Sequence, residues 1–226
     1  MAAAMTLYRS TIGKKAIMAV TGVILYGFVI VHMIGNLKIF EGPEGFNAYS
    51  HFLRVVGEPA LPAGTILWLI RIVLTLALIL HVNAAIQLTR IDSAGRPVAY
   101  KKVKRKQASF ASMTLRWGGT AIFFFVIYHL MHFTIGTAHP QFVEGEPYHN
   151  VVSGFQLQPL MAGVYILAVA ALGTHLYHGV WSATQTLGLN NRRNDKLFRG
   201  LAVLSGIGLF VGFAAIPVVV LLGIIK

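Results

Sequence analysis

The chain has 226 residues, of which 56% are hydrophobic and only 12% are charged. A soluble globular domain carries about 25% charged residues, so this composition excludes a soluble enzyme and a disordered protein and indicates a membrane protein. The net charge is +12, but Lys and Arg gather in short segments between apolar stretches, which indicates membrane topology rather than nucleic-acid binding. The absence of cysteine excludes disulfides and cysteine-ligated iron–sulfur clusters from this chain.

Five apolar stretches are each long enough to cross a membrane as an α-helix, for which about 20 residues are needed. They cover residues 16–35, 63–88, 117–136, 159–187 and 201–225. The first is too long for the apolar part of a signal peptide, and no small-residue cleavage site follows it. The sequence therefore predicts an all-α membrane protein, in which residues 1–226 form one domain of five transmembrane helices.

Basic residues predict the orientation, because cytoplasmic connections are enriched in Lys and Arg. They gather in the N-terminal tail and in the connections after the second and fourth spans: Arg9, Lys14, Lys15, Arg90, Arg96, Lys101, Lys102, Lys104, Arg105, Lys106, Arg116, Arg192, Arg193, Lys196 and Arg199. The other two connections hold five of the seven acidic residues: Glu41, Glu44, Glu58, Glu144 and Glu146. We therefore expect a multi-pass protein of the cytoplasmic (inner) membrane with a cytoplasmic N-terminus.

Histidines occur in each of the first four spans, and a histidine inside a membrane is costly and typically functional. The first and third spans run outward, and in both a glycine precedes a histidine by ten residues. These pairs are Gly22 with His32, and Gly119 with His129. The second and fourth spans run inward and also contain histidines, so the four spans resemble a weakly repeated helix pair.

Depth along the helices predicts how the histidines pair. His32 and His129 lie about 25 Å and about 20 Å beyond the basic residues before their spans, toward the outer side. His81 lies about 14 Å from the basic residue that ends its span, and His175 lies on the other inward-running span. We expect His32 and His129 to ligate one haem iron, and His81 and His175 a second on the inner side. Such bis-histidine sites favour electron transfer, because no coordination position is open.

Two alternatives accompany this interpretation. His132 lies one turn beyond His129, and His178 one turn beyond His175. Spacing within one helix does not show which of two neighbouring histidines is the ligand, although the repeat favours His129 over His132 and His175 over His178. Zinc is the rival metal, but a structural zinc site needs four clustered ligands, commonly with sulfur, and no HExxH motif is present.

Three segments resemble a known family: STIGKKAIMAVTG at 10–22, HMIGNL at 32–37 and NAY at 47–49. They are similar to the cytochrome b membrane-anchor subunit of succinate dehydrogenase/fumarate reductase, in its single-chain, five-helix, di-haem branch. The resemblance covers essentially the whole chain. It implies one axial histidine on each of the first four helices, with the first helix paired to the third and the second to the fourth.

The resemblance also implies a place in complex II of the tricarboxylic acid cycle. The chain would be the membrane subunit of the enzyme, and the dicarboxylate site would lie on a flavoprotein subunit that holds FAD. Electrons would pass through an iron–sulfur subunit and two haem b groups to a membrane quinone, commonly menaquinone. No nucleic acid is implied as a partner.

Arg71 is the only charge well inside a span. It lies ten residues before His81, near the predicted outer level, where it would contact a haem propionate or a quinone, or would extend to the interface. Three histidines of the outer connections are expected at the interface or in solvent: His51, His139 and His149.

Two other functions remain as alternatives. One is the cytochrome b subunit of a hydrogenase or formate dehydrogenase, in which two haem ligands often come from one helix. The other is a transporter with a histidine proton relay, which would need neither haem nor soluble partner subunits.

Overall fold

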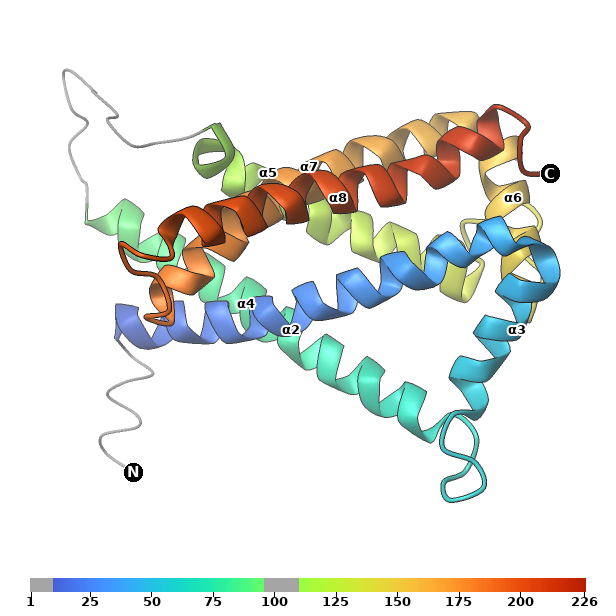
Figure 1. Ribbon diagram of the computed structural model, residues 1–226, viewed down its shortest axis with the longest axis horizontal. Helices are drawn as coiled ribbons and strands as arrows, with labels where there is room; N and C mark the ends of the chain where they lie inside the picture. Colours follow the sequence, from blue (N-terminus) through green and yellow to red (C-terminus); the bar gives the residue numbers. More distant parts are fainter. Residues whose placement is uncertain (1–9, 96–109) are drawn as a thin grey trace.

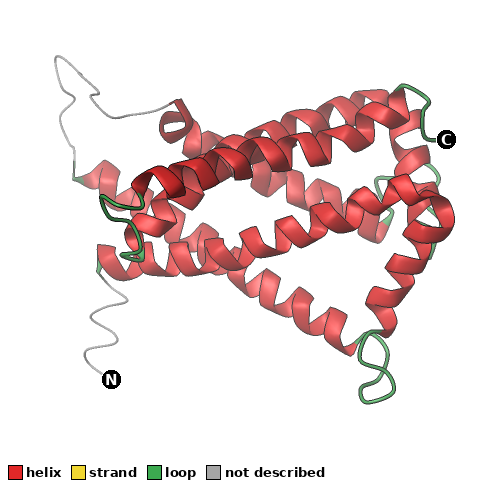
Figure 2. Cartoon of the chain, in the orientation of Figure 1, coloured by secondary structure: helices red, strands yellow, loops and turns green. Residues whose placement is uncertain are grey.

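The computed structural model describes residues 10–95 and 110–226. Helices make up 82% of these residues, which contain no strand (Figure 2). Five helices are long and apolar enough to cross a membrane. They are α2 (Thr11–Leu37), α4 (Thr65–Ala94), α5 (Phe110–Leu130) with its π-helical continuation η2 (Met131–Ile135), α7 (Pro159–Thr186) and α8 (Asp195–Leu221). The predicted all-α class with five helices of membrane-spanning length is therefore confirmed.

Four of the long helices, α2, α4, α5 and α8, extend beyond the apolar stretches that predicted them at one end or both. Helix α2 begins at Thr11 rather than at residue 16, because the Ser10 side chain caps it by accepting a hydrogen bond from the Gly13 backbone at 3.0 Å. A serine at this position satisfies one of the free N–H groups of the first turn. Helix α8 likewise begins at Asp195 rather than at residue 201 and ends at Leu221. Hydropathy locates the apolar part of each helix and misses its polar ends.

Two shorter helices, which the sequence analysis did not predict, lie in the acidic connections. They are α3 (Gly42–Val55), which follows the 3₁₀ segment η1 (Lys38–Glu41), and α6 (Pro147–Leu157). Both lie at the end of the molecule opposite the start of α2 (Figure 1). Asn47 joins them: its side chain donates to Glu146 Oε2 at 2.7 Å and accepts from the Tyr148 backbone at 3.1 Å.

The long helices pack as two pairs and a fifth helix. Helix α2 packs against α4, and α5 packs against α7, while α8 lies along α7 (Figure 1). The contact of α7 with α8 is close because Gly173 and Gly206 face each other. A Cβ atom added to Gly173 would lie 2.8 Å from the Gly206 carbonyl oxygen, and one added to Gly206 would lie 2.7 Å from that of Gly173. Small residues allow helix backbones to approach in this way in membranes.

Charge separates the two ends of the bundle. Where α2 and α5 begin, α4 ends and α7 connects to α8, the described residues include eight basic side chains: Lys14, Lys15, Arg90, Arg116, Arg192, Arg193, Lys196 and Arg199. The five glutamates lie in the segments at the other end. The remaining predicted basic residues lie outside the described residues: Arg9, Arg96, Lys101, Lys102, Lys104, Arg105 and Lys106. Which end faces the cytoplasm stays a prediction from this asymmetry.

Candidate functional site

Four histidines from four different helices lie in two pairs. His32 on α2 and His129 on α5 have ring centres 5.9 Å apart, with ring planes at 82°. His81 on α4 and His175 on α7 have ring centres 6.4 Å apart, with ring planes at 63°. The structure thus brings together the same two pairs that depth along the helices predicts. Ligation of haem by these pairs stays a prediction.

The neighbouring histidines do not occupy these positions. His132 is completely buried, and its closest ring contacts are with Phe133 at 4.1 Å and His139 at 5.1 Å. It lies in η2, whose π-helical turn begins just after His129. The wider π turn interrupts the α-helical register, which accounts for the different surroundings of the two imidazoles. His178 is partly buried, one turn beyond His175.

The spacing of both pairs fits two imidazoles that bind one metal from opposite sides. A metal–imidazole bond is about 2 Å long, and a ring centre lies a further ~1 Å behind its nitrogen. Two imidazoles that held one metal ion between them would therefore have ring centres about 6 Å apart. The observed 5.9 Å and 6.4 Å agree with this requirement.

The pair of His81 and His175, which we call the inner pair after its predicted position, lies against two glycines. A Cβ atom added to Gly22 would lie 3.3 Å from Cε1 of His81, and one added to Gly119 would lie 3.4 Å from Cε1 of His175. These are the two glycines that precede the outer histidines by ten residues. Helices α2 and α5 therefore each give an imidazole to one pair and, about 15 Å earlier along the helix axis, a glycine that leaves room for an imidazole of the other pair.

Helix α2 also fixes the tautomer of His81. Its Nδ1 atom lies 3.1 Å from the Met18 carbonyl oxygen and 3.3 Å from Oγ1 of Thr21. The Thr21 hydroxyl donates its own proton to the Ile17 carbonyl at 2.7 Å, so both neighbours of Nδ1 are acceptors. Nδ1 must therefore carry the proton, and Nε2 keeps the lone pair that a metal needs.

Aromatic side chains surround the outer pair. His32 stacks on Phe28 with ring centres 5.2 Å apart, and Phe213 of α8 lies 5.9 Å from it. Nδ1 of His129 lies 3.2 Å from the hydroxyl of Tyr165 on α7. Tyr165 was missed by the sequence analysis, although a signal was present. It stands ten residues before His175 on the same helix, which places it at the level of the other pair, His32 with His129.

The donor set suits haem better than zinc. Among residues 10–95 and 110–226, no group of three or more His, Cys, Asp or Glu side chains is placed to hold a metal ion. The predicted ligands meet only in twos, which is the number that a bis-histidine haem takes from protein. The Nδ1 atom of His175 is buried without a hydrogen-bond partner, so the inner pair also contains a polar atom that the described residues leave unsatisfied.

The structure also places Arg71 and the three histidines of the acidic connections. Arg71 is exposed, and its guanidinium lies 4.9 Å from the ring centre of Trp68, which is 61% exposed on the same helix. This arrangement is typical of an interfacial anchor. The expectation for His139 is wrong: it is buried, donates from Nε2 to the Asn150 carbonyl at 2.7 Å and accepts from the Gln141 backbone at 3.0 Å. His51 and His149 are exposed, as expected.

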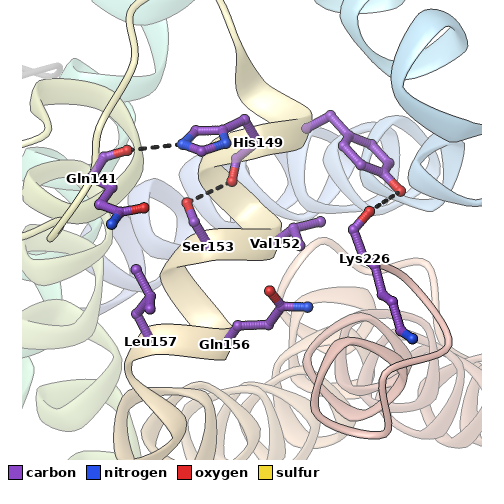
Figure 3. A pocket seen from close by; sticks show the side chains of 8 residues that line it. Gln141, His149, Val152, Ser153, Gln156, Leu157 and Lys226 are labelled. Atoms are coloured by element: carbon purple, nitrogen blue, oxygen red, sulfur yellow. Dashed lines mark hydrogen bonds between the residues drawn. The ribbon is translucent and has the colours of Figure 1, made fainter.

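A cavity of about 340 Å³ lies at the acidic end, separate from both pairs. Helix α6 provides His149, Ser153 and Gln156 to its wall, and Lys226 lies opposite (Figure 3). The His149 ring donates to the Gln141 carbonyl at 3.2 Å. None of the four predicted haem ligands lines this cavity.

Comparisons of the chain with protein-family models, with curated proteins and with solved structures find no match. The site offers two pairs of imidazoles in membrane-spanning helices, each with the spacing of a bis-histidine metal site.

Proposed function

We propose that the chain is the di-haem cytochrome b membrane anchor of a succinate:quinone oxidoreductase. The observation that carries the haem assignment is the presence of two imidazole pairs, with ring centres 5.9 Å and 6.4 Å apart, formed by one histidine from each of four helices. The assignment to this enzyme is supported by the resemblance of the segments at 10–22, 32–37 and 47–49.

In this proposal each histidine has one role. His32 and His129 hold the outer haem, and His81 and His175 hold the inner one. Haem b held by two imidazoles supplies reversible one-electron transfer, because the iron has no open position for oxygen. The Met18 carbonyl and the Thr21 hydroxyl keep the proton of His81 on Nδ1, which leaves Nε2 for the iron.

Aromatic side chains pack around both histidines of the outer pair. Phe28 and Phe213 flank His32, and Phe125 and Phe133 lie with ring centres 5.9 Å and 5.8 Å from that of His129. An apolar, hydrogen-bonded shell of this kind tunes a redox centre, because it sets the local dielectric constant and the basicity of the ligands.

The distribution of the predicted ligands, one on each of four helices, disfavours the hydrogenase and formate dehydrogenase type of cytochrome b, in which two ligands often share a helix.

The charge asymmetry supports an orientation. The positive-inside rule places the basic end in the cytoplasm, so the flavoprotein with FAD and the iron–sulfur subunit would dock there, nearest the inner pair. The quinone in this proposal is menaquinone, which anchors of this kind commonly use. The protein would then reside in the cytoplasmic membrane with its N-terminus inside.

Reduction of the haems by succinate tests the enzyme assignment. In membranes that contain the whole complex, succinate is expected to produce the reduced haem b absorption bands, and malonate is expected to block them. Membranes from cells that lack this chain serve as the control. Reduction by hydrogen or formate but not by succinate would assign the chain to the alternative cytochrome b class. Absence of haem bands would reject both cytochrome assignments and favour the histidine-relay transporter.

A further inference from the structure

The hydroxyl of Tyr165 lies between two imidazoles. It is 3.2 Å from Nδ1 of His129 and 3.0 Å from Nδ1 of His132. The Tyr165 side chain is only 7% exposed. Its ring packs edge-on against Phe125 at 4.8 Å and Phe155 at 5.1 Å between ring centres. The aromatic contacts hold the phenol in place, so the position of its oxygen is set by packing from α5, α6 and α7.

Given the proposed function on which this step rests, one assignment of donors satisfies both hydrogen bonds and also gives the Tyr165 O–H an acceptor. If Nε2 of His129 binds iron, its Nδ1 carries the proton and must donate. The Tyr165 oxygen then accepts from His129, and its own O–H is free to donate to Nδ1 of His132. The proton of neutral His132 consequently lies on Nε2.

His132 is thereby excluded as a ligand. Its Nδ1 lone pair is used by Tyr165, and its Nε2 carries a proton and has no partner among the described residues. His139, whose ring centre lies 5.1 Å away, offers no acceptor, because its Nε2 donates to Asn150 and its Nδ1 already accepts from Gln141. A single hydroxyl thus gives the two histidines opposite tautomers.

We propose that Tyr165 is the positioning residue of the outer pair, which orients His129, keeps the proton on its Nδ1 and selects it over His132 as the ligand. An acceptor at Nδ1 raises the basicity of a ligating imidazole. A more basic ligand stabilises ferric over ferrous iron, so it lowers the reduction potential of that haem. The Tyr165 hydroxyl therefore acts on the outer haem and not on the inner one.

Potentiometric titration of the purified complex, followed by optical and electron paramagnetic resonance spectra, tests this role. Tyr165→Phe removes the hydroxyl and keeps the ring. We expect the midpoint potential of the outer haem to become more positive and its low-spin resonance to move, while the inner haem keeps both values. The outer haem is identified as the one that is lost in His32→Ala.

Tyr128→Phe is the matched control. Its ring lies 6.2 Å from that of Tyr165 in the same aromatic cluster, but its hydroxyl is in neither of the two imidazole hydrogen bonds, so both potentials are expected to stay unchanged. His132→Leu is a second variant, which removes the acceptor of the Tyr165 proton. It is expected to shift the outer potential in the same direction by a smaller amount, because the Tyr165 oxygen is then less polarised.

The outcomes separate this inference from the proposed function. A wild-type complex without haem overturns both. A wild-type complex with two haems, whose outer potential is the same in Tyr165→Phe, overturns the positioning role alone. Equal shifts of both haems in Tyr165→Phe would also overturn it, because a general loss of packing rather than a bond to His129 would then be the cause.

Discussion

The imidazole of His81 lies directly against Gly22 of the neighbouring helix, where an added Cβ atom would be 3.3 Å from its Cε1 atom. His175 has the same relationship to Gly119 at 3.4 Å. In each case the glycine stands ten residues before the histidine of the outer pair. The weak repeat in the sequence therefore has a structural counterpart, in which α2 and α5 each contribute to both imidazole pairs.

The first prediction concerns Gly119. Gly119→Val places a branched side chain against the His175 ring, because even a Cβ atom would be 3.4 Å from Cε1. We expect the variant to lose the inner haem and keep the outer one, as measured by haem content and by the two potentials. Gly118→Val is the control, since a Cβ atom there has nothing within 4 Å. Retention of both haems with unchanged potentials in Gly119→Val would contradict the proposed place of the inner site.

A second prediction concerns the contact of α7 with α8. Gly206→Val forces its Cβ atom toward the Gly173 carbonyl oxygen, which would be 2.7 Å away. Overpacking of this kind costs about 1–3 kcal/mol, so the thermal midpoint in detergent is expected to fall. Gly208→Val on the same helix is the matched control, because its Cβ atom would meet nothing within 4 Å. Equal midpoints for the two variants would show that the glycine contact contributes nothing to stability.

The third prediction concerns Arg71. Its guanidinium lies over the exposed ring of Trp68, so Arg71→Leu is expected to leave both haem potentials unchanged and to affect only how well the helix inserts. Potentiometry and the yield of membrane-inserted protein measure these two effects separately. Arg71→Lys keeps the charge and is expected to restore the yield. A shifted outer potential in Arg71→Leu, with normal yield, would instead assign Arg71 to a propionate or quinone.

The sequence predicts those features that depend on one helix at a time. Apolar length is enough to find the five long helices, but not the start of α2, which depends on the Ser10 cap. Helices α3 and α6 were missed because their residues are mixed in polarity and the link through Asn47 forms only in the folded chain. Each of these differences comes from polar groups at helix ends, on which hydropathy carries no information.

The choice between the neighbouring histidines His129 and His132 needed the tertiary structure. His129 and His132 are close on an ideal α-helix, and it is the π-helical turn of η2 together with Tyr165 of α7 that gives them different surroundings. The burial of His139 likewise depends on the Asn150 carbonyl of α6. Depth along the spans, by contrast, was enough to group His32 with His129 and His81 with His175.

Haem content in single histidine variants is the most direct test of the central claim. The wild-type chain is expected to contain about two haems, measured as the pyridine haemochrome, in line with one haem for each bis-histidine pair. His32→Ala and His129→Ala should each remove one and the same haem, and His81→Ala and His175→Ala the other. His178→Ala, one turn from His175, should keep both. A colourless wild-type protein, or variants that all retain two haems, would contradict the account.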